Sequence, residues 1–189
     1  EGQQTEALQK YLLVARLYTL RGERVQAISL LQRVLKIAPM DLDIRNQLIN
    51  LLVSEGRVDD AIQQKLDLAR ANYQLADLDT AHKIYKSAMR LVQESSHSRR
   101  WAFKILQQLT DIDMQRLDLR QAVRVYEQIR SLEPDDIGIS SQLADLYFRT
   151  GQDAQAVAEV EKTVNLMEKS GQRQEAIDFL NQQLSERPQ

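Results

Sequence analysis

One pattern recurs along this chain: a short polar break is followed, a few residues later, by an alanine within a helix-like stretch. Six alanines occupy this place, and successive ones are 34, 20, 41, 34 and 20 residues apart: Ala27, Ala61, Ala81, Ala122, Ala156 and Ala176. A step of 34 residues is the period of a helix-turn-helix repeat. Because a small side chain lets two helices approach closely, the pattern predicts an array of packed helix pairs.

The chain also repeats itself over a longer interval of 95 residues. The first three alanines of the series each have a counterpart 95 residues later. Seven further identical pairs share this offset: Arg21 and Arg116, Gln26 and Gln121, Pro39 and Pro134, Asp41 and Asp136, Leu48 and Leu143, Leu51 and Leu146, and Gly56 and Gly151. Ten pairs at one offset indicate a duplication. We therefore expect two five-helix modules, residues 5–93 and 99–187, joined by a junction at 94–98.

Between the breaks, apolar residues follow the three- and four-residue spacing of amphipathic helices. Glycine and proline together make up 9 of the 189 residues, too few for the many tight turns of an all-β chain. We therefore expect about ten helices and no strand. Residues 59–76 and 153–169 contain neither glycine nor proline, and each is expected to form one continuous helix. Five aspartates stand where helix N-caps are expected: Asp41, Asp59, Asp79, Asp118 and Asp136.

Composition excludes several classes of function. The chain has no cysteine and two histidines, which excludes disulfides, a cysteine nucleophile and a multi-histidine metal centre. No phosphate-binding glycine loop or hydrolase motif occurs. A net charge of −2 gives no general attraction to nucleic acid or to anionic membranes, and no apolar run is long enough to span a bilayer. We expect a cytoplasmic protein that is not an enzyme and needs neither metal nor cofactor.

The chain resembles the tetratricopeptide repeat family, as a bacterial-type helical repeat scaffold. The family pattern is aromatic-x2-Leu-small-x2-Tyr, then Ala-x3-aromatic, then proline. The first repeat has Tyr11, Val14, Ala15, Tyr18, Ala27, Leu31 and Pro39 at these positions, and the fourth has Leu106, Leu109, Thr110, Ala122, Tyr126 and Pro134. Asp113 replaces the tyrosine of the fourth repeat. The resemblance implies an all-α fold, a right-handed superhelical solenoid of antiparallel helix pairs.

The resemblance also implies that partners bind the concave face, which is lined by the first helix of each pair. Asn46 and Asn50 are one helical turn apart and could hydrogen-bond an extended backbone, although both could equally be ordinary solvated side chains. Tyr73 and Phe148 could anchor a partner or simply pack between repeats. Carried onto this chain, the candidate partner-binding residues are Arg16, Asn46, Asn50, Arg70, Tyr73, Phe148 and Arg149.

A second candidate site is the basic segment from His82 to Lys104. It contains six lysine and arginine residues and one acidic residue, Glu94, which gives a local charge of +5. Basic residues at three- and four-residue steps add their charges on one side of a helix. This segment predicts a site for an acidic partner, although a solvated helix face is the usual role of such a run. Its candidate binding residues are Lys83, Lys86, Arg90, Arg99, Arg100 and Trp101.

Together these features predict a non-catalytic scaffold or adaptor that binds a peptide or protein segment, on the concave face or at the basic segment. Two alternatives stay open. The first is a self-assembly domain that forms homo-oligomers, because no polar capping helix follows the last apolar helix of the chain. The second is a nucleic-acid-binding helical repeat, which the net charge of −2 disfavours. Since the chain starts at Glu1 without methionine, flanking domains are also expected.

Overall fold

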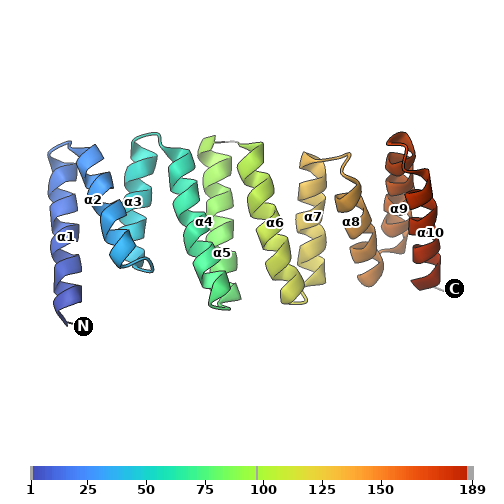
Figure 1. Cartoon of the computed structure of the whole chain (residues 1–189), viewed down its shortest axis with the longest axis horizontal. Helices are drawn as coiled ribbons and strands as arrows, with labels where there is room; N and C mark the ends of the chain where they lie inside the picture. The colour runs from blue at the N-terminus through green and yellow to red at the C-terminus, as the bar shows by residue number, and fades with distance from the viewer. Residues whose placement is uncertain (1, 97, 187–189) are drawn as a thin grey trace. The chain divides into compact units, whose positions relative to one another are not determined.

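The computed structural model describes residues 2–96 and 98–186. Within these ranges it contains ten α-helices and no β-strand, which confirms the predicted all-α fold class. His97, in the predicted junction, and Arg187, the predicted end of the second module, lie outside the described residues. Contacts divide the chain into two compact units, Glu1–Ser98 and Arg99–Gln189. Within each unit, consecutive helices run antiparallel and lie side by side (Figure 1).

The helices of the two units correspond one to one. Unit 1 contains α1 (Gly2–Leu20), α2 (Arg24–Ile37), α3 (Leu42–Ser54), α4 (Val58–Gln74) and α5 (Leu78–Leu91). Unit 2 contains α6 (Arg99–Gln115), α7 (Leu119–Leu132), α8 (Ile137–Arg149), α9 (Asp153–Lys169) and α10 (Arg173–Glu186). From α2 to α5, both bounds of every helix recur 95 residues later. The offset found in the sequence is therefore also the offset of the structure.

One element between the helices is not predicted by the residue spacing. A turn of π-helix, η1 (Val92–Ser96), continues α5 and also contacts α4. The side chain of Val92 is buried, so η1 starts as part of the packed structure of unit 1.

Six of the turns within the units share one backbone conformation. In each turn, one residue has a positive φ, and the N–H of the next residue donates to the carbonyl five residues earlier at 2.8–3.0 Å. This bond is the mark of the Schellman motif, which ends a helix by satisfying one of its last carbonyls. The positive-φ residues are Gly22, Gly56, Ala76, Leu117, Gly151 and Gly171.

The six alanines of the sequence pattern each follow a positive-φ residue by five positions. All six side chains are at most 3% exposed. Their N–H groups donate to the carbonyl four residues earlier, at 2.9–3.2 Å, so each alanine lies in the first turn of the new helix. The burial agrees with the predicted role of these residues, since only a small side chain lets neighbouring helices meet directly after so short a turn.

Both long helices without glycine or proline are present, and α9 (Asp153–Lys169) has the predicted bounds. Helix α4 (Val58–Gln74) ends before the predicted residue 76, because Ala76 adopts a positive φ in the turn that follows it. α4 and α9 each contain 17 residues. α4 packs against both α3 and α5, and α9 packs against both α8 and α10. Each of these helices therefore completes one helix pair and begins the next, which explains the 20-residue steps in the alanine series.

Three of the five predicted N-caps are confirmed. In each, the aspartate side chain accepts a hydrogen bond from the backbone N–H three residues later, at 2.9–3.2 Å. These bonds satisfy N–H groups that lack a partner in the first turn of a helix. The confirmed caps are Asp41, Asp118 and Asp136.

The predictions for Asp59 and Asp79 are wrong, because both lie inside the first turn of their helices. Helix α4 begins after Arg57, whose side chain makes no capping bond, and α5 begins after Asp77, whose carboxylate accepts from the Thr80 N–H at 3.1 Å. The reason is the turn. The residue that follows the positive-φ position is already the N-cap, so the helix starts earlier than the aspartates suggest.

Two of the six turns have a residue other than glycine at the positive-φ position, and this predicts a stabilising substitution. Ala76 and Leu117 have φ values of 60° and 57°, a conformation that costs a residue with a Cβ roughly 1–2 kcal/mol. We expect Ala76→Gly and Leu117→Gly each to raise the free energy of unfolding by about 1 kcal/mol, measured by urea denaturation. Gly56→Ala and Gly151→Ala, at equivalent positions, should lower it. If all four variants have the same free energy of unfolding as the unmodified chain, the positive φ values of Ala76 and Leu117 cause no backbone strain.

Candidate functional site

The candidate site in unit 1 is a groove between α1 and α3, with α2 at its base; we call it the α1–α3 groove. Its cavity has a volume of about 500 Å³. Apolar atoms of Ala15, Leu31 and Leu51 contribute to its lining, together with polar side chains from α1 and α3. The polar lining residues are Arg16, Thr19, Gln47, Asn50 and Ser54.

The structure thus brings two of the sequence-predicted residues, Arg16 and Asn50, to one cavity from different helices. Both side chains are exposed, and neither forms a hydrogen bond or ion pair with any described residue. The Thr19 hydroxyl in the groove already forms a hydrogen bond within its own helix, because it donates to the Ala15 carbonyl at 2.9 Å. Asn46 is exposed one turn before Asn50 on α3 and does not line the cavity. The free polar groups of the groove are therefore one cation, Arg16, and two amides, Gln47 and Asn50.

The equivalent region of unit 2 has the opposite charge. Asp111 stands 95 residues after Arg16, and Asp145 stands 95 residues after Asn50. Asp145 forms an ion pair with Arg149 at 3.6 Å, whereas burial raises the pKa of the Asp111 carboxyl. The same backbone framework therefore presents acidic groups in unit 2 where unit 1 presents a cation and an amide.

The region of unit 2 that corresponds to the α1–α3 groove is also divided into two cavities. Tyr126 replaces Leu31 of unit 1, and its hydroxyl donates a hydrogen bond to Gln142, the counterpart of Gln47. Tyr126 and Gln142 line two separate cavities of about 440 and 320 Å³, one of which also contains Asp111 and the other Asp145. A segment that fits the α1–α3 groove would meet a different shape and charge here.

Two further predicted residues, Phe148 and Arg149, lie together at the end of α8. They line a cavity of about 860 Å³ with residues of α9 and α10, which we call the α8–α10 groove. Its lining includes the apolar side chains Val157, Val160, Leu180 and Leu184. The remaining predicted residues of the concave set, Arg70 and Tyr73, are exposed and half-buried, respectively, on α4.

The residues of the basic segment fall on helices of different units. Lys83, Lys86 and Arg90 are exposed along α5, and Arg100 is exposed at the start of α6. The neighbouring Trp101 is half-buried, and the Lys104 ammonium lies 5.2 Å from the centre of its ring. This distance is typical of a cation–π contact.

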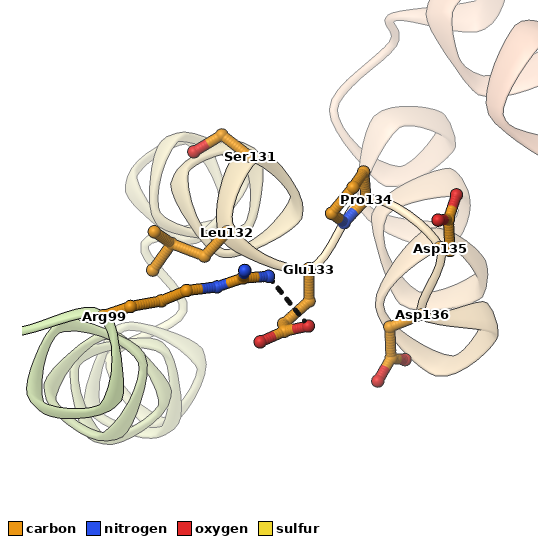
Figure 2. Close-up of a pocket in the computed structure, with 7 residues that line it drawn as sticks. All are labelled: Arg99, Ser131, Leu132, Glu133, Pro134, Asp135 and Asp136. Carbon is orange, nitrogen blue, oxygen red and sulfur yellow. Dashed lines mark ion pairs between the residues drawn. The ribbon is translucent and has the colours of Figure 1, made fainter.

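Arg99, the other predicted residue of this segment, has acidic surroundings. Its guanidinium forms an ion pair with Glu133 at 3.1 Å (Figure 2). Arg99 and Glu133 line a cavity of about 710 Å³ together with Asp135 and Asp136, beside the turn that contains Pro134. One cation and three carboxylates thus line this cavity, which makes it unfavourable for an anionic ligand.

Two polar contacts between helices of unit 2 are not predicted by any sequence pattern. Arg130 of α7 forms an ion pair with the buried Glu159 of α9, and the Tyr147 hydroxyl of α8 donates to Glu127 of α7 at 2.8 Å. Burial, with the hydrogen bond to Glu127, raises the pKa of Tyr147 to about 12. The partners are 20 and 29 residues apart and follow no periodic pattern, so no sequence signal pairs them.

Unit 1 holds a different polar contact in the equivalent region. Arg45 is buried and donates to the Pro39 carbonyl at 2.5 Å, to the Gln64 carbonyl at 3.2 Å and to the Gln64 side chain at 3.1 Å. Burial lowers the pKa of its guanidinium, and the charge of Asp67 opposes this shift. In both units these contacts join neighbouring helices of the same unit.

Two structural features bear on metal and membrane binding. Among the residues that the structure describes, no group of three or more histidine and acidic side chains is placed to hold a metal ion. In the same part of the chain, no helix has the length and apolar character needed to cross a membrane.

The pKa of Tyr147 predicts how stability depends on pH. An unfolded tyrosine has a pKa of about 10, so the folded state holds the Tyr147 proton more tightly. The resulting stability is fully present below about pH 10 and is lost as the pH rises through the folded value of about 12. We expect Tyr147→Phe to make the alkaline fall in unfolding free energy shallower, as measured by urea denaturation over a pH series. An unchanged slope would show that Tyr147 titrates normally.

Comparison with known proteins identifies the repeat type. A family model described as "Tetratricopeptide repeat protein 21 ARM repeat" matches residues 5–164. No curated protein is significantly similar to the chain.

Solved structures of other helical repeat proteins are similar over most of their length. One is MamA, with 19% sequence identity, 90% coverage of this chain, 96% coverage of MamA and a TM-score of 0.46. PilF of Pseudomonas aeruginosa is 16% identical, with 100% and 95% coverage and a TM-score of 0.45. YrrB, described as a TPR protein with an unusual peptide-binding site, is 13% identical, with 93% and 97% coverage and a TM-score of 0.44. On the strength of the family match, which confirms the predicted tetratricopeptide-like repeats, the chain belongs to the tetratricopeptide repeat protein 21 ARM repeat family.

Proposed function

We propose that this chain is a non-catalytic protein-interaction scaffold that binds an extended peptide segment in the α1–α3 groove. Membership in a tetratricopeptide-like repeat family supports a role in protein interaction. The observation that carries the site is that Arg16 of α1 and Asn50 of α3 line one cavity together with the apolar residues Ala15, Leu31 and Leu51. Neither side chain is engaged by another described residue, so both are available to a ligand.

The chemistry of these two side chains defines the kind of segment. A guanidinium binds a carboxylate through two parallel hydrogen bonds, so Arg16 favours a segment with an acidic side chain. The Asn50 amide offers both a donor and an acceptor, which suits the N–H and C=O groups of an extended backbone. The apolar lining from Ala15, Leu31 and Leu51 would hold a small apolar side chain of the same segment.

The alternatives have less support. At the basic segment, Arg99 is already paired with Glu133, and the cavity beside it carries more carboxylates than cations. Lys83, Lys86, Arg90 and Arg100 keep their exposure, so an acidic partner there stays a secondary proposal. Nucleic-acid binding is less favoured still, because it relies on many phosphate contacts and the chain carries a net charge of −2.

A displayed library of unstructured peptides, selected on the full chain, tests this proposal. We expect acidic peptides to be enriched, and Arg16→Gln to weaken the selected peptide by about tenfold or more, since losing a charge-assisted hydrogen bond costs about 1.5–3 kcal/mol. The affinity is measured by fluorescence anisotropy. Asn46→Ala with Asn50→Ala should also weaken binding.

Arg99→Glu with Arg100→Glu is the matched control for a charge change outside the groove. This double variant should bind the selected peptide as the unmodified chain does. If it alone loses binding, while Arg16→Gln and the asparagine variant keep it, the ligand binds at the basic segment and the α1–α3 groove is not the site.

A further inference from the structure

One cavity of unit 2 contains a carboxylate that has no counter-charge among the described residues. This cavity has a volume of about 440 Å³ and is lined by residues of α6, α7 and α8, so we call it the α6–α8 cavity. Its polar groups come from all three helices: Gln107 and Asp111 from α6, Tyr126 from α7 and Gln142 from α8. Because every lining residue belongs to unit 2, the cavity is formed within that unit alone.

Asp111 has only one weak partner in the part of the chain that the structure describes. Its Oδ2 atom accepts a hydrogen bond from the Gln108 side chain at 3.4 Å, which is longer than a typical bond of this kind. No other described residue donates to this carboxylate or forms an ion pair with it. Burial raises the pKa of the Asp111 carboxyl, and no neighbouring charge offsets this shift. A bound cation would supply the missing counter-charge.

The second feature of the α6–α8 cavity is the aromatic ring of Tyr126. The Tyr126 hydroxyl donates a hydrogen bond to Gln142 and thereby links α7 to α8. Burial, followed by the charge of Asp111, raises the pKa of Tyr126, so the ring and the carboxylate lie close together. A guanidinium suits this pair of groups, because it binds a carboxylate through two parallel hydrogen bonds and stacks on aromatic rings.

We propose that the α6–α8 cavity binds an arginine side chain of a partner protein, with Asp111 as the counter-ion and Tyr126 as the stacking surface. Gln107 is exposed and forms no hydrogen bond with a described residue, so its amide oxygen can accept from the remaining guanidinium N–H groups. A divalent metal ion fits this cavity less well, because such ions need several oxygen ligands and the described residues offer a single carboxylate here.

The repeated framework does not require this chemistry, because unit 1 differs at the positions that correspond to Gln107, Asp111 and Tyr126. The residues found there, 95 positions earlier, are Leu12, Arg16 and Leu31. A ligand arginine would be repelled by the cation of unit 1 and attracted by the carboxylate of unit 2, so it distinguishes the two units. This inference goes beyond the proposed peptide-binding function and does not rest on it, since no residue of the α6–α8 cavity lines the α1–α3 groove.

A titration of the full chain with Nα-acetyl-arginine amide, followed by nuclear magnetic resonance, tests the inference. We expect saturable shifts of the Gln107 side-chain amide and the Tyr126 ring signals. Nα-acetyl-citrulline amide has nearly the same shape but no charge, so it should bind much more weakly. Asp111→Asn should weaken binding of the arginine probe by about tenfold or more, the loss expected for a charge-assisted hydrogen bond. The spectrum of this variant also shows whether it is folded.

The matched control is Asp178→Asn, which removes the same charge from an exposed aspartate of α10, outside the α6–α8 cavity. This variant should bind the arginine probe as the unmodified chain does. So should Arg16→Gln, which alters the α1–α3 groove, and the two proposed sites can therefore fail independently of each other. Four results would overturn the inference: no saturable shift with the arginine probe, equal binding of the citrulline probe, unchanged affinity of Asp111→Asn, or an equal loss of affinity in Asp178→Asn.

Discussion

The whole fold depends on the close contact made by an alanine directly after a helix-ending turn. The positive-φ residue ends one helix, and five positions later the alanine is buried in the next one. A larger side chain at that place would push the two helices apart, because packed interiors have no spare volume. Since six turns repeat the same geometry, the helices of each unit pack at regular intervals, and the grooves between them follow from that spacing.

Much of this architecture could be predicted from the sequence, because it depends on residues that recur at fixed intervals. The alanine steps and the 95-residue offset predicted ten helices, and the continuous helices α4 and α9 followed from the missing breaks. The turns at Ala76 and Leu117 contain no glycine, so the sequence does not predict the positive φ of these two residues. The start of α4 at Val58 was misjudged for a related reason: a turn geometry, not an aspartate, determines where that helix begins.

The candidate site was only partly predictable. The family resemblance singled out Arg16 and Asn50, and the structure adds that they share a cavity with apolar residues of α1, α2 and α3. Whether a charged residue is free or paired depends on neighbours that are distant in sequence. The ion pair of Arg99 with Glu133 spans 34 residues, and that of Arg130 with Glu159 spans 29. No local pattern marks such pairs.

Duplication explains why two nearly equal frameworks differ in chemistry. From α2 to α5 the helix bounds recur in unit 2, where the same turns and alanine contacts recur, whereas residues that line the grooves differ between the units. Asp111 of unit 2 stands at the position of Arg16, and Tyr126 stands at the position of Leu31 and donates a hydrogen bond to Gln142. The two units therefore offer different surfaces on one backbone design.

We attribute the close packing of the helices to the buried alanines, and larger side chains at these positions test this role. Ala61→Leu and Ala156→Leu should each lower the free energy of unfolding by roughly 1–3 kcal/mol through overpacking, measured by urea denaturation. Ala154→Leu, on an exposed position of the same helix as Ala156, is the control and should leave stability nearly unchanged. If the two buried variants are as stable as this control, the helices do not depend on close contact at these alanines.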